Sequence, residues 1–193
     1  QNSVVQRLRG HLREALQTCD TVLQVLGDLD GFTAMQAHRN TGICYAMLGR
    51  VTEGVGQLQA ALELAEANAD ETNAAQIAHD MGVMEMMRGQ LASAQNQYRR
   101  ALGYWRKVGN ASALASTLQS LGVVHHHLGQ YAESEARFQE ALARAREVGD
   151  TRVEAYALAS QGDLYRDMAA MRTHALRTRR RWTWQRPMRT PGW

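Results

Sequence analysis

Glycine recurs at a fixed interval along this chain of 193 residues. Four glycines lie forty residues apart, and a second series keeps that interval until alanine replaces its fourth member. A third series has alanine followed by leucine in each copy. The three series are Gly42, Gly82, Gly122 and Gly162; Gly49, Gly89, Gly129 and Ala169; and Ala61, Ala101 and Ala141. Independent series in one register indicate an internal repeat, so the chain folds as an array of similar stacked units.

Each unit is predicted to form two helices. In the unit 111–150 the first segment carries apolar residues at helical spacing, namely Leu114, Leu118, Leu121 and Val124. Gly129 then ends this helix, because glycine readily adopts the left-handed conformation found after many helices. A second stripe follows over 131–147, formed by Tyr131, Ser134, Phe138, Ala141, Leu142 and Ala145. The fold class predicted is therefore all-α.

The glycines at 42, 82, 122 and 162 fall in the middle of the first helix of each unit. A glycine there costs roughly 1 kcal/mol relative to alanine. Repeated use implies a packing reason, because a missing side chain lets a neighbouring helix approach closely. We therefore expect a close helix–helix contact at all four positions.

These motifs resemble the tetratricopeptide repeat. The unit from 111 carries Leu118, Leu121, Gly122 and His125, then Ser134, Phe138 and Ala141; earlier units carry Gly82, Ala94, Tyr98 and Ala101, and Gly42, Tyr45, Gly54, Leu58 and Ala61. The longer unit and the absent closing proline are similar to the forty-residue variety in maltose-activator-type and LuxR-type bacterial regulators and in Pins and kinesin-light-chain adaptors. The resemblance covers roughly residues 4–170 and implies a right-handed superhelix of helical pairs.

The repeat register predicts the organisation of the chain. Residues 1–31 form a partial first repeat opened by Gly10, and residues 32–70, 71–110 and 111–150 form three full repeats. Residues 151–170 start a further repeat, and residues 171–193 form a basic tail. The start of the sequence lacks an initiating Met and an apolar signal core, which favours an internal piece of a longer protein.

The resemblance implies that the first helix of each pair lines a concave face. It nominates a polar set of mixed charge as the groove: Gln36, Arg39, Asn40, Gln76, His79, Asp80, Met86, Ser116, Gln119, Ser120, His126, Tyr156, Asp163 and Arg166. Such a set could hold an extended peptide by hydrogen bonds, with Met86 adapting to its side chains. Asn40 occupies the position where peptide-binding members often clamp a ligand backbone. The alternative is that these residues form solvated helix faces.

The charge of the body argues against nucleic acid as its main ligand. Residues 171–193 hold seven Arg and no acidic residue, which leaves 15 basic and 19 acidic residues in the rest. Phosphate binding needs a basic face, which this body lacks. No window approaches the 18 or so consecutive apolar residues of a membrane span. The two cysteines, Cys19 and Cys44, are too few for a disulfide framework and are expected to be small buried residues in a reducing, cytoplasmic setting.

The sequence offers no catalytic constellation and implies no cofactor or metal. His125, His126 and His127 are consecutive, and successive helical residues point about 100° apart, so the three cannot converge on one ion. No phosphate-binding loop, nucleophile elbow or metalloprotease motif is present. The chain is therefore predicted not to be an enzyme.

The tail departs from the repeat after Met168, where His174 and Thr178 take the places of Ser134 and Phe138. Three interpretations remain open: a basic arm for nucleic acid or anionic membrane, an unstructured terminus, and a change of reading frame in the gene. A changed frame would leave the last helix without its partner helix. Tyr156, Leu158 and Leu164 would then be poorly covered.

The function predicted is a protein-interaction scaffold for a peptide, a protein or other domains of the parent chain. Its expected setting is a sensor segment of a bacterial signalling or transcriptional regulator, which rests on the resemblance alone. Two alternatives stay open. One is small-ligand sensing in a pocket closed by Met86, His126 and Tyr156, and the other is nucleic-acid binding through the tail.

Overall fold

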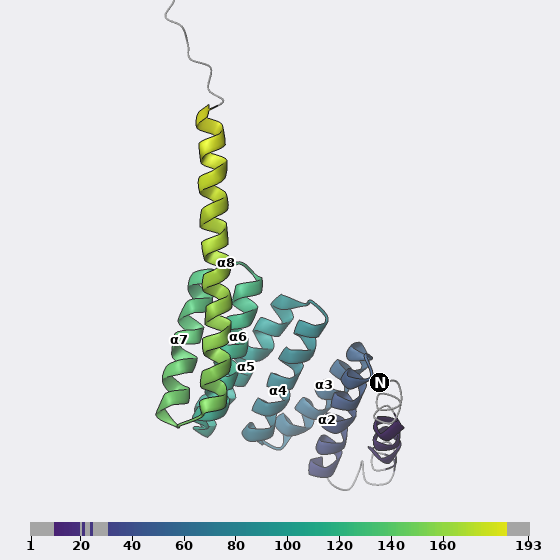
Figure 1. The fold of residues 1–193 in the computed structure, drawn as a ribbon. Coiled ribbons are helices and arrows are strands. Elements are labelled where there is room, and N and C mark those ends of the chain that lie inside the picture. Colours follow the sequence, from purple (N-terminus) through teal and green to yellow (C-terminus); the bar gives the residue numbers. More distant parts are fainter. Residues whose placement is uncertain (1–9, 20, 22–23, 25–30, 185–193) are drawn as a thin grey trace, which may run out of the picture.

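Helices account for all the regular structure in the described part of the chain (Figure 1). The computed structural model describes residues 10–19, 21, 24 and 31–184, and residues 174–184 as backbone only. Residues 10–19 are helical. The helices that follow are α2 (Gly31–Met47), α3 (Val51–Ala67), α4 (Glu71–Met87), α5 (Leu91–Val108), α6 (Ala111–His127), α7 (Tyr131–Glu147) and α8 (Thr151–Trp184). None of these helices combines the length and apolar character needed to cross a bilayer.

The helices form antiparallel pairs, α2 with α3, α4 with α5 and α6 with α7, and the pairs stack in sequence order (Figure 1). Each first helix ends at a glycine of the second series. Gly49, Gly89 and Gly129 adopt φ values of 80°, 71° and 72°, the left-handed conformation that the sequence predicts. Contacts also join α4 to α6 and α6 to α8, so the first helices adjoin one another along one face of the stack.

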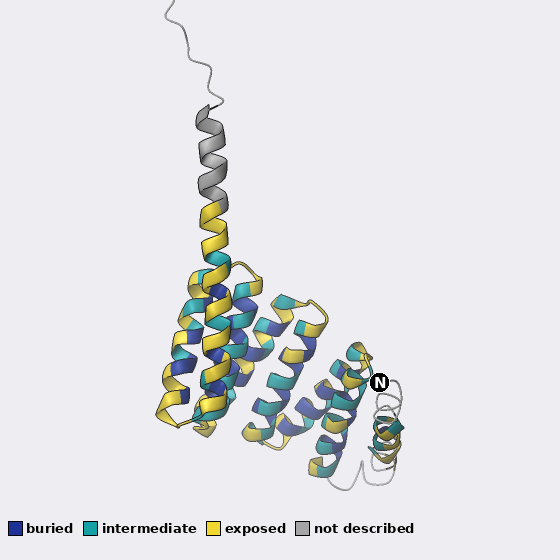
Figure 2. Cartoon of the chain, viewed as in Figure 1, coloured by how far each residue is buried: buried dark blue, intermediate teal, exposed yellow. Residues whose placement is uncertain are grey.

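The core follows the predicted apolar stripes (Figure 2). Leu114, Leu118, Leu121 and Val124 of α6 are all buried, and so are Ser134, Phe138, Ala141, Leu142 and Ala145 of α7. Tyr131, at the start of α7, is half-buried. One continuous apolar cluster runs from α4 to α8, because a helical pair can cover its apolar face only against the next pair.

The mid-helix glycines are contact points between the helices of one pair. A methyl group added at Gly82 would lie 2.6 Å from the Tyr98 ring, and one added at Gly122 would lie 2.5 Å from the Phe138 ring. At Gly42 it would lie 2.9 Å from the carbonyl oxygen of Gly54. The prediction of a close contact is therefore confirmed at three positions. It is wrong at Gly162, where no atom lies within 4 Å.

The last helix differs from the first helices that precede it. Helix α8 continues unbroken to Trp184, whereas one interpretation of the tail expected an unstructured terminus from residue 171. Ala169 stands where the other units have a left-handed glycine. The helix continues through this position because alanine is a strong helix former that rarely adopts positive φ. Residues 185–193 of the predicted tail lie outside the described residues.

Candidate functional site: the concave face

Polar side chains join the first helices of successive pairs. The bonds connect residues 37 to 41 positions apart, which is about one repeat. They run from α2 to α4, from α4 to α6 and from α6 to α8. We call this set the polar ladder. Six of the fourteen residues predicted for the groove belong to it: Gln36, Arg39, His79, Asp80, Gln119 and His126.

The first rungs of the polar ladder join α2 to α4. Gln36 donates to the side-chain oxygen of Asn73 at 3.2 Å, and Arg39 donates to Asp80 at 2.8 Å. Gln76 donates to the second oxygen of Asp80 at 3.2 Å. The Arg39–Asp80 pair is shielded from water, with side chains 22% and 18% exposed. This partial burial reduces screening and makes the pair stronger than a surface salt bridge.

His79 forms the rung between α4 and α6. Its Nδ1 lies 3.0 Å from the hydroxyl of Thr117, and that hydroxyl donates to the carbonyl of Ala113 at 2.8 Å. Because the Thr117 proton is used in this way, Nδ1 of His79 is the donor and Nε2 carries the acceptor lone pair. Burial lowers the pKa of His79, so the ring is neutral at pH 7.

The last rungs join α6 to α8. Gln119 donates to the hydroxyl of Ser160 at 2.9 Å, and Nε2 of His126 lies 3.0 Å from Asp167. On α8 itself, Arg166 pairs with Asp163 at 2.9 Å and approaches Asp167 at 3.8 Å. Positive and negative groups thus alternate here, and this end of the face carries no single dominant charge.

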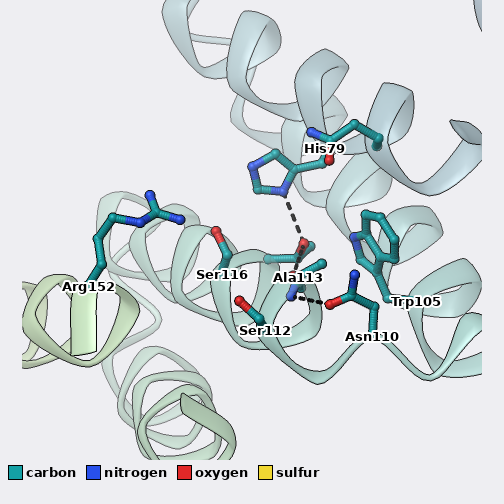
Figure 3. Close-up of a pocket in the computed structure, with 9 residues that line it drawn as sticks. His79, Trp105, Asn110, Ser112, Ala113, Ser116 and Arg152 are labelled. Atoms are coloured by element: carbon teal, nitrogen blue, oxygen red, sulfur yellow. Dashed lines mark hydrogen bonds between the residues drawn. The ribbon is translucent and has the colours of Figure 1, made fainter. Parts of the chain in front are cut away.

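A hollow of about 340 Å³ opens on the face formed by the first helices, which we call the concave face, and it is lined from α4, α6, α8 and the end of α5 (Figure 3). Its lining is mostly polar: Gln76, His79, Trp105, Asn110, Ser112, Ala113, Ser116, Thr117 and Arg152. The Arg152 side chain reaches over it from the first turn of α8 toward Ser116, and Trp105 closes the opposite side (Figure 3). A cation, several hydroxyls and one aromatic side chain therefore face a single opening.

Three of the predicted groove residues, Gln76, His79 and Ser116, line this hollow. The others lie elsewhere on the molecule. Met86 packs against the core with its sulfur 3.8 Å from the hydroxyl of Tyr98, and Tyr156 is exposed. The alternative of small-ligand sensing expected a pocket closed by Met86, His126 and Tyr156. None of these three residues lines the hollow. Ser120, also on α6, donates to the carbonyl of Ser116 at 3.1 Å.

Asn40 lies beside a different hollow, at the other end of the stack. This second hollow lies between α2 and the helical residues 10–19, and its lining includes Cys19 and Cys44. Both cysteines are free thiols of intermediate burial, less buried than the sequence predicts. Burial raises the pKa of the Cys44 thiol, with a smaller contribution from Cys19, so Cys44 is poorly suited to nucleophilic chemistry.

Sequence reasoning missed the lining residues that come from helix starts. Asn110 precedes α6, Ser112 lies in its first turn, and Arg152 lies in the first turn of α8. The prediction selected positions in the middle of each first helix, whereas the hollow extends from such positions to the starts of α6 and α8. The forty-residue register places Ser112 and Arg152 at the same position of successive repeats, which could have identified them.

The three consecutive histidines diverge. Nδ1 of His125 lies 2.6 Å from the side-chain oxygen of Gln130, and His126 contacts Asp167. The ring of His127 stacks on that of His126, with centroids 6.0 Å apart. Among the residues that the structure describes, no group of three or more metal-ligating side chains converges. The arrangement of the concave face suits hydrogen bonding rather than metal or nucleophilic chemistry.

Residues 112–177 match the tetratricopeptide repeat family. No curated protein matches the sequence. Several solved structures share the fold. Aspartyl phosphate phosphatase F from Bacillus subtilis is 14% identical with a TM-score of 0.70, over 74% of this chain and 38% of that one. BtubC from P. vanneervenii is 17% identical with a TM-score of 0.68, over 97% of this chain and 81% of that one.

A third similar structure is the Rap conjugation gene regulator of the plasmid pLS20, in complex with the Phr* peptide. It is 20% identical with a TM-score of 0.63, and the match covers 76% of this chain and 39% of that one. The chain therefore spans less than half the length of the phosphatase and of the Rap regulator. At these identities the likeness concerns the fold.

Proposed function

This chain carries tetratricopeptide repeats, and we propose that it is a non-catalytic interaction module that binds an extended peptide segment on its concave face. The hollow between α4, α6 and α8 is the main contact, and the polar ladder beside it supports the rest of the peptide. The peptide is either a separate molecule or a segment of another domain of the parent protein.

The hollow at the junction of three repeats is the observation that carries this proposal. Its polar lining can replace the water around a peptide backbone, since Ser116 and the Asn110 amide offer donors and acceptors and Ser112, whose hydroxyl donates to Asp150, offers an acceptor. Arg152 adds a cationic group that favours a carboxylate, either an acidic side chain or the peptide terminus (Figure 3). Trp105 provides an apolar wall for one side chain of the ligand.

The setting we propose is the sensor or interaction segment of a bacterial signalling or transcriptional regulator. The Rap regulator, which shares the fold, is a gene regulator in complex with a peptide, and this supports the proposal by analogy of fold. The mildly acidic body of the chain is consistent with a protein partner rather than nucleic acid.

Selection from a random peptide library on the immobilised chain tests the proposal. Recovered peptides are then labelled, and their affinity is measured by fluorescence anisotropy against three variants. Arg152→Glu reverses the charge over the hollow and Ser116→Arg fills it, so each should weaken binding at least about tenfold. Arg144→Glu, on the outer helix α7, is the matched control and should leave the affinity within about twofold.

The opposite pattern would overturn the proposal. If the recovered peptides bind the Arg152→Glu and Ser116→Arg chains as tightly as the unmodified one, the hollow is not the binding site. Thermal unfolding of each variant checks that the change acts on binding and not on folding.

A further inference from the structure

The outer face of α8 carries an apolar seam over which no described helix packs, and the hydroxyl of Tyr165 at its edge donates to Glu135 of α7 at 2.7 Å. Ala155, Leu158, Gly162, Tyr165 and Ala169 follow one another at alternating intervals of three and four residues, and all five are exposed. Leu158 and Tyr165 are 45% and 46% exposed. This spacing places all five on one side of the helix, as in the seam of a helical pair. We call this set the α8 seam.

The α8 seam repeats a surface that is buried in the preceding unit. The same repeat positions on α6 are occupied by Ala115, Leu118, Gly122 and His125, which α7 covers and which are all buried. The opposite side of α8 is packed normally, since Val153, Ala157 and Leu164 are buried. The expectation of poor cover for Leu164 is therefore wrong, while Tyr156 and Leu158 are exposed.

Within the described residues, no helix turns back after α8 to pack along this face. In the other units a left-handed glycine turns the chain back, so that the second helix packs along the first. Here α8 continues straight through the corresponding position, Ala169, to Trp184 (Figure 1). Gly162 consequently keeps a space above it that is filled by Leu58, Tyr98 or Phe138 in the other three pairs.

The three complete pairs show what kind of segment fits that space. Each second helix carries a small residue, a large apolar residue four positions later and an alanine three positions after that: Gly54, Leu58 and Ala61; Ala94, Tyr98 and Ala101; Ser134, Phe138 and Ala141. The large residue lies against the mid-helix glycine. In the pair formed by α6 and α7 the small residue also bonds to that glycine, since the hydroxyl of Ser134 donates to the carbonyl of Gly122 at 2.9 Å.

We propose that the α8 seam is a docking surface for an amphipathic helix of a separate partner protein. The helix carries the small-x₃-large-x₂-Ala pattern and places its large residue over Gly162. It extends the established helix–helix interface of the stack by one helix, running antiparallel to α8. This site is at the end of the solenoid and is independent of the concave hollow, so the two sites can be occupied separately.

A labelled peptide with the sequence of residues 129–149 is the probe, because it reproduces the helix that covers the equivalent face of α6. Fluorescence anisotropy should detect binding to the intact chain. Gly162→Leu fills the space and Leu158→Asp charges the seam, so each should weaken binding at least about tenfold. Tyr156→Ala, an exposed α8 residue outside the seam, is the matched control and should change the affinity less than about twofold.

The folded state of each variant is checked by circular dichroism and thermal unfolding. No atom lies within 4 Å of the Gly162 site, so Gly162→Leu should unfold no more readily than the unmodified chain. A probe carrying Ala in place of its Phe138 should bind at least about tenfold more weakly. Peptides selected for the concave hollow should bind Gly162→Leu normally, which separates this test from that of the proposed function.

Three results would overturn the proposal. The first is the absence of binding up to about 1 mM probe. The second is equal binding by the unmodified chain and Gly162→Leu, which would indicate that the probe attaches elsewhere. The third is self-association of the chain in sedimentation experiments that Leu158→Asp abolishes, which would assign the seam to a second copy.

Discussion

At the scale of single residues, the glycines at the middle of the first helices have unequal roles. Gly82 and Gly122 are required by the aromatic rings that lie against them, whereas Gly162 meets nothing within 4 Å. The sequence shows all four as one column because it records the repeat and not the partner helix. The close helix contact could therefore be predicted for Gly42, Gly82 and Gly122. Its absence at Gly162 could not be predicted, because it depends on the path of α8.

Alanine substitutions at two of these glycines should have opposite effects. Gly122→Ala brings a methyl group 2.5 Å from the Phe138 ring, and we expect a loss of about 1–3 kcal/mol in the free energy of unfolding. Gly162→Ala meets no atom within 4 Å and should gain up to about 1 kcal/mol from helix propensity. Urea unfolding of the two variants checks both signs. Equal effects of the two substitutions would contradict the assigned contacts.

The buried ring of His79 should make stability depend on pH. Burial lowers its pKa from 6.5, while Asp80 opposes this effect weakly, so the unfolded chain takes up a proton at higher pH than the folded chain. Stability should therefore fall as the pH drops below about 6.5. Hydrogen bonds to the carboxyls of Asp70 and Asp150 lower their pKa values, so protonation of these two groups reduces stability only in more acidic solution.

Thermal unfolding between pH 7 and pH 5 measures this dependence. His79→Gln should show a smaller decrease in melting temperature over that range than the unmodified chain. His127→Gln is the matched control, since His127 is an exposed residue of the same type. An unchanged pH dependence in His79→Gln would show that the proton uptake has another origin.

At the scale of helices, the residue after each helix decides where the chain turns. The predicted glycine ends are confirmed at Gly49, Gly89 and Gly129. The second helices turn at Gly109 and Gly149, and at the same repeat position Ala69 adopts a positive φ of 53°. The long α8 was harder to predict, because the loss of one glycine from a series does not by itself show whether a chain turns, frays or continues.

Ala69→Gly should stabilise the end of α3. A left-handed alanine costs roughly 1–2 kcal/mol, and the greater freedom of glycine in the unfolded chain offsets part of that gain. We expect a net increase of about 0.5–1 kcal/mol in the free energy of unfolding. Gly109→Ala is the reciprocal variant and should lose a similar amount, since Gly109 has a φ of 76°. Urea unfolding of both variants tests the prediction, which fails if Ala69→Gly is destabilising.

At the scale of the whole molecule, each helical pair is stabilised mainly by its neighbours. Helices α4 to α7 have a packed helix on both sides along the stack, while no described helix packs on the outer face of α8. The stacking could be predicted from the repeat alone. The position of the hollow could not, because it depends on how the starts of α6 and α8 come together around Trp105.

Hydrogen exchange followed by mass spectrometry should show this unequal stability. Amides of α4 to α7 should exchange most slowly, and those of residues 166–173 of α8 more rapidly, because the side chains of that stretch are exposed or only half-buried. Gly162→Ala should slow exchange within α8 without altering α4. Uniform exchange rates along the chain would indicate that it unfolds as one unit, and would contradict the picture of stacked pairs.

The polar ladder also determines how the molecule responds to mechanical load. A hydrogen bond between two side chains can be exchanged for bonds to water at a net cost of only about 1 kcal/mol, whereas the interlocked core cannot slide without opening voids. The concave wall is therefore the compliant side of the superhelix and the apolar layer behind it the stiff side. We therefore expect the superhelical pitch to change under load by breaking hydrogen bonds such as Gln36–Asn73 and Gln119–Ser160.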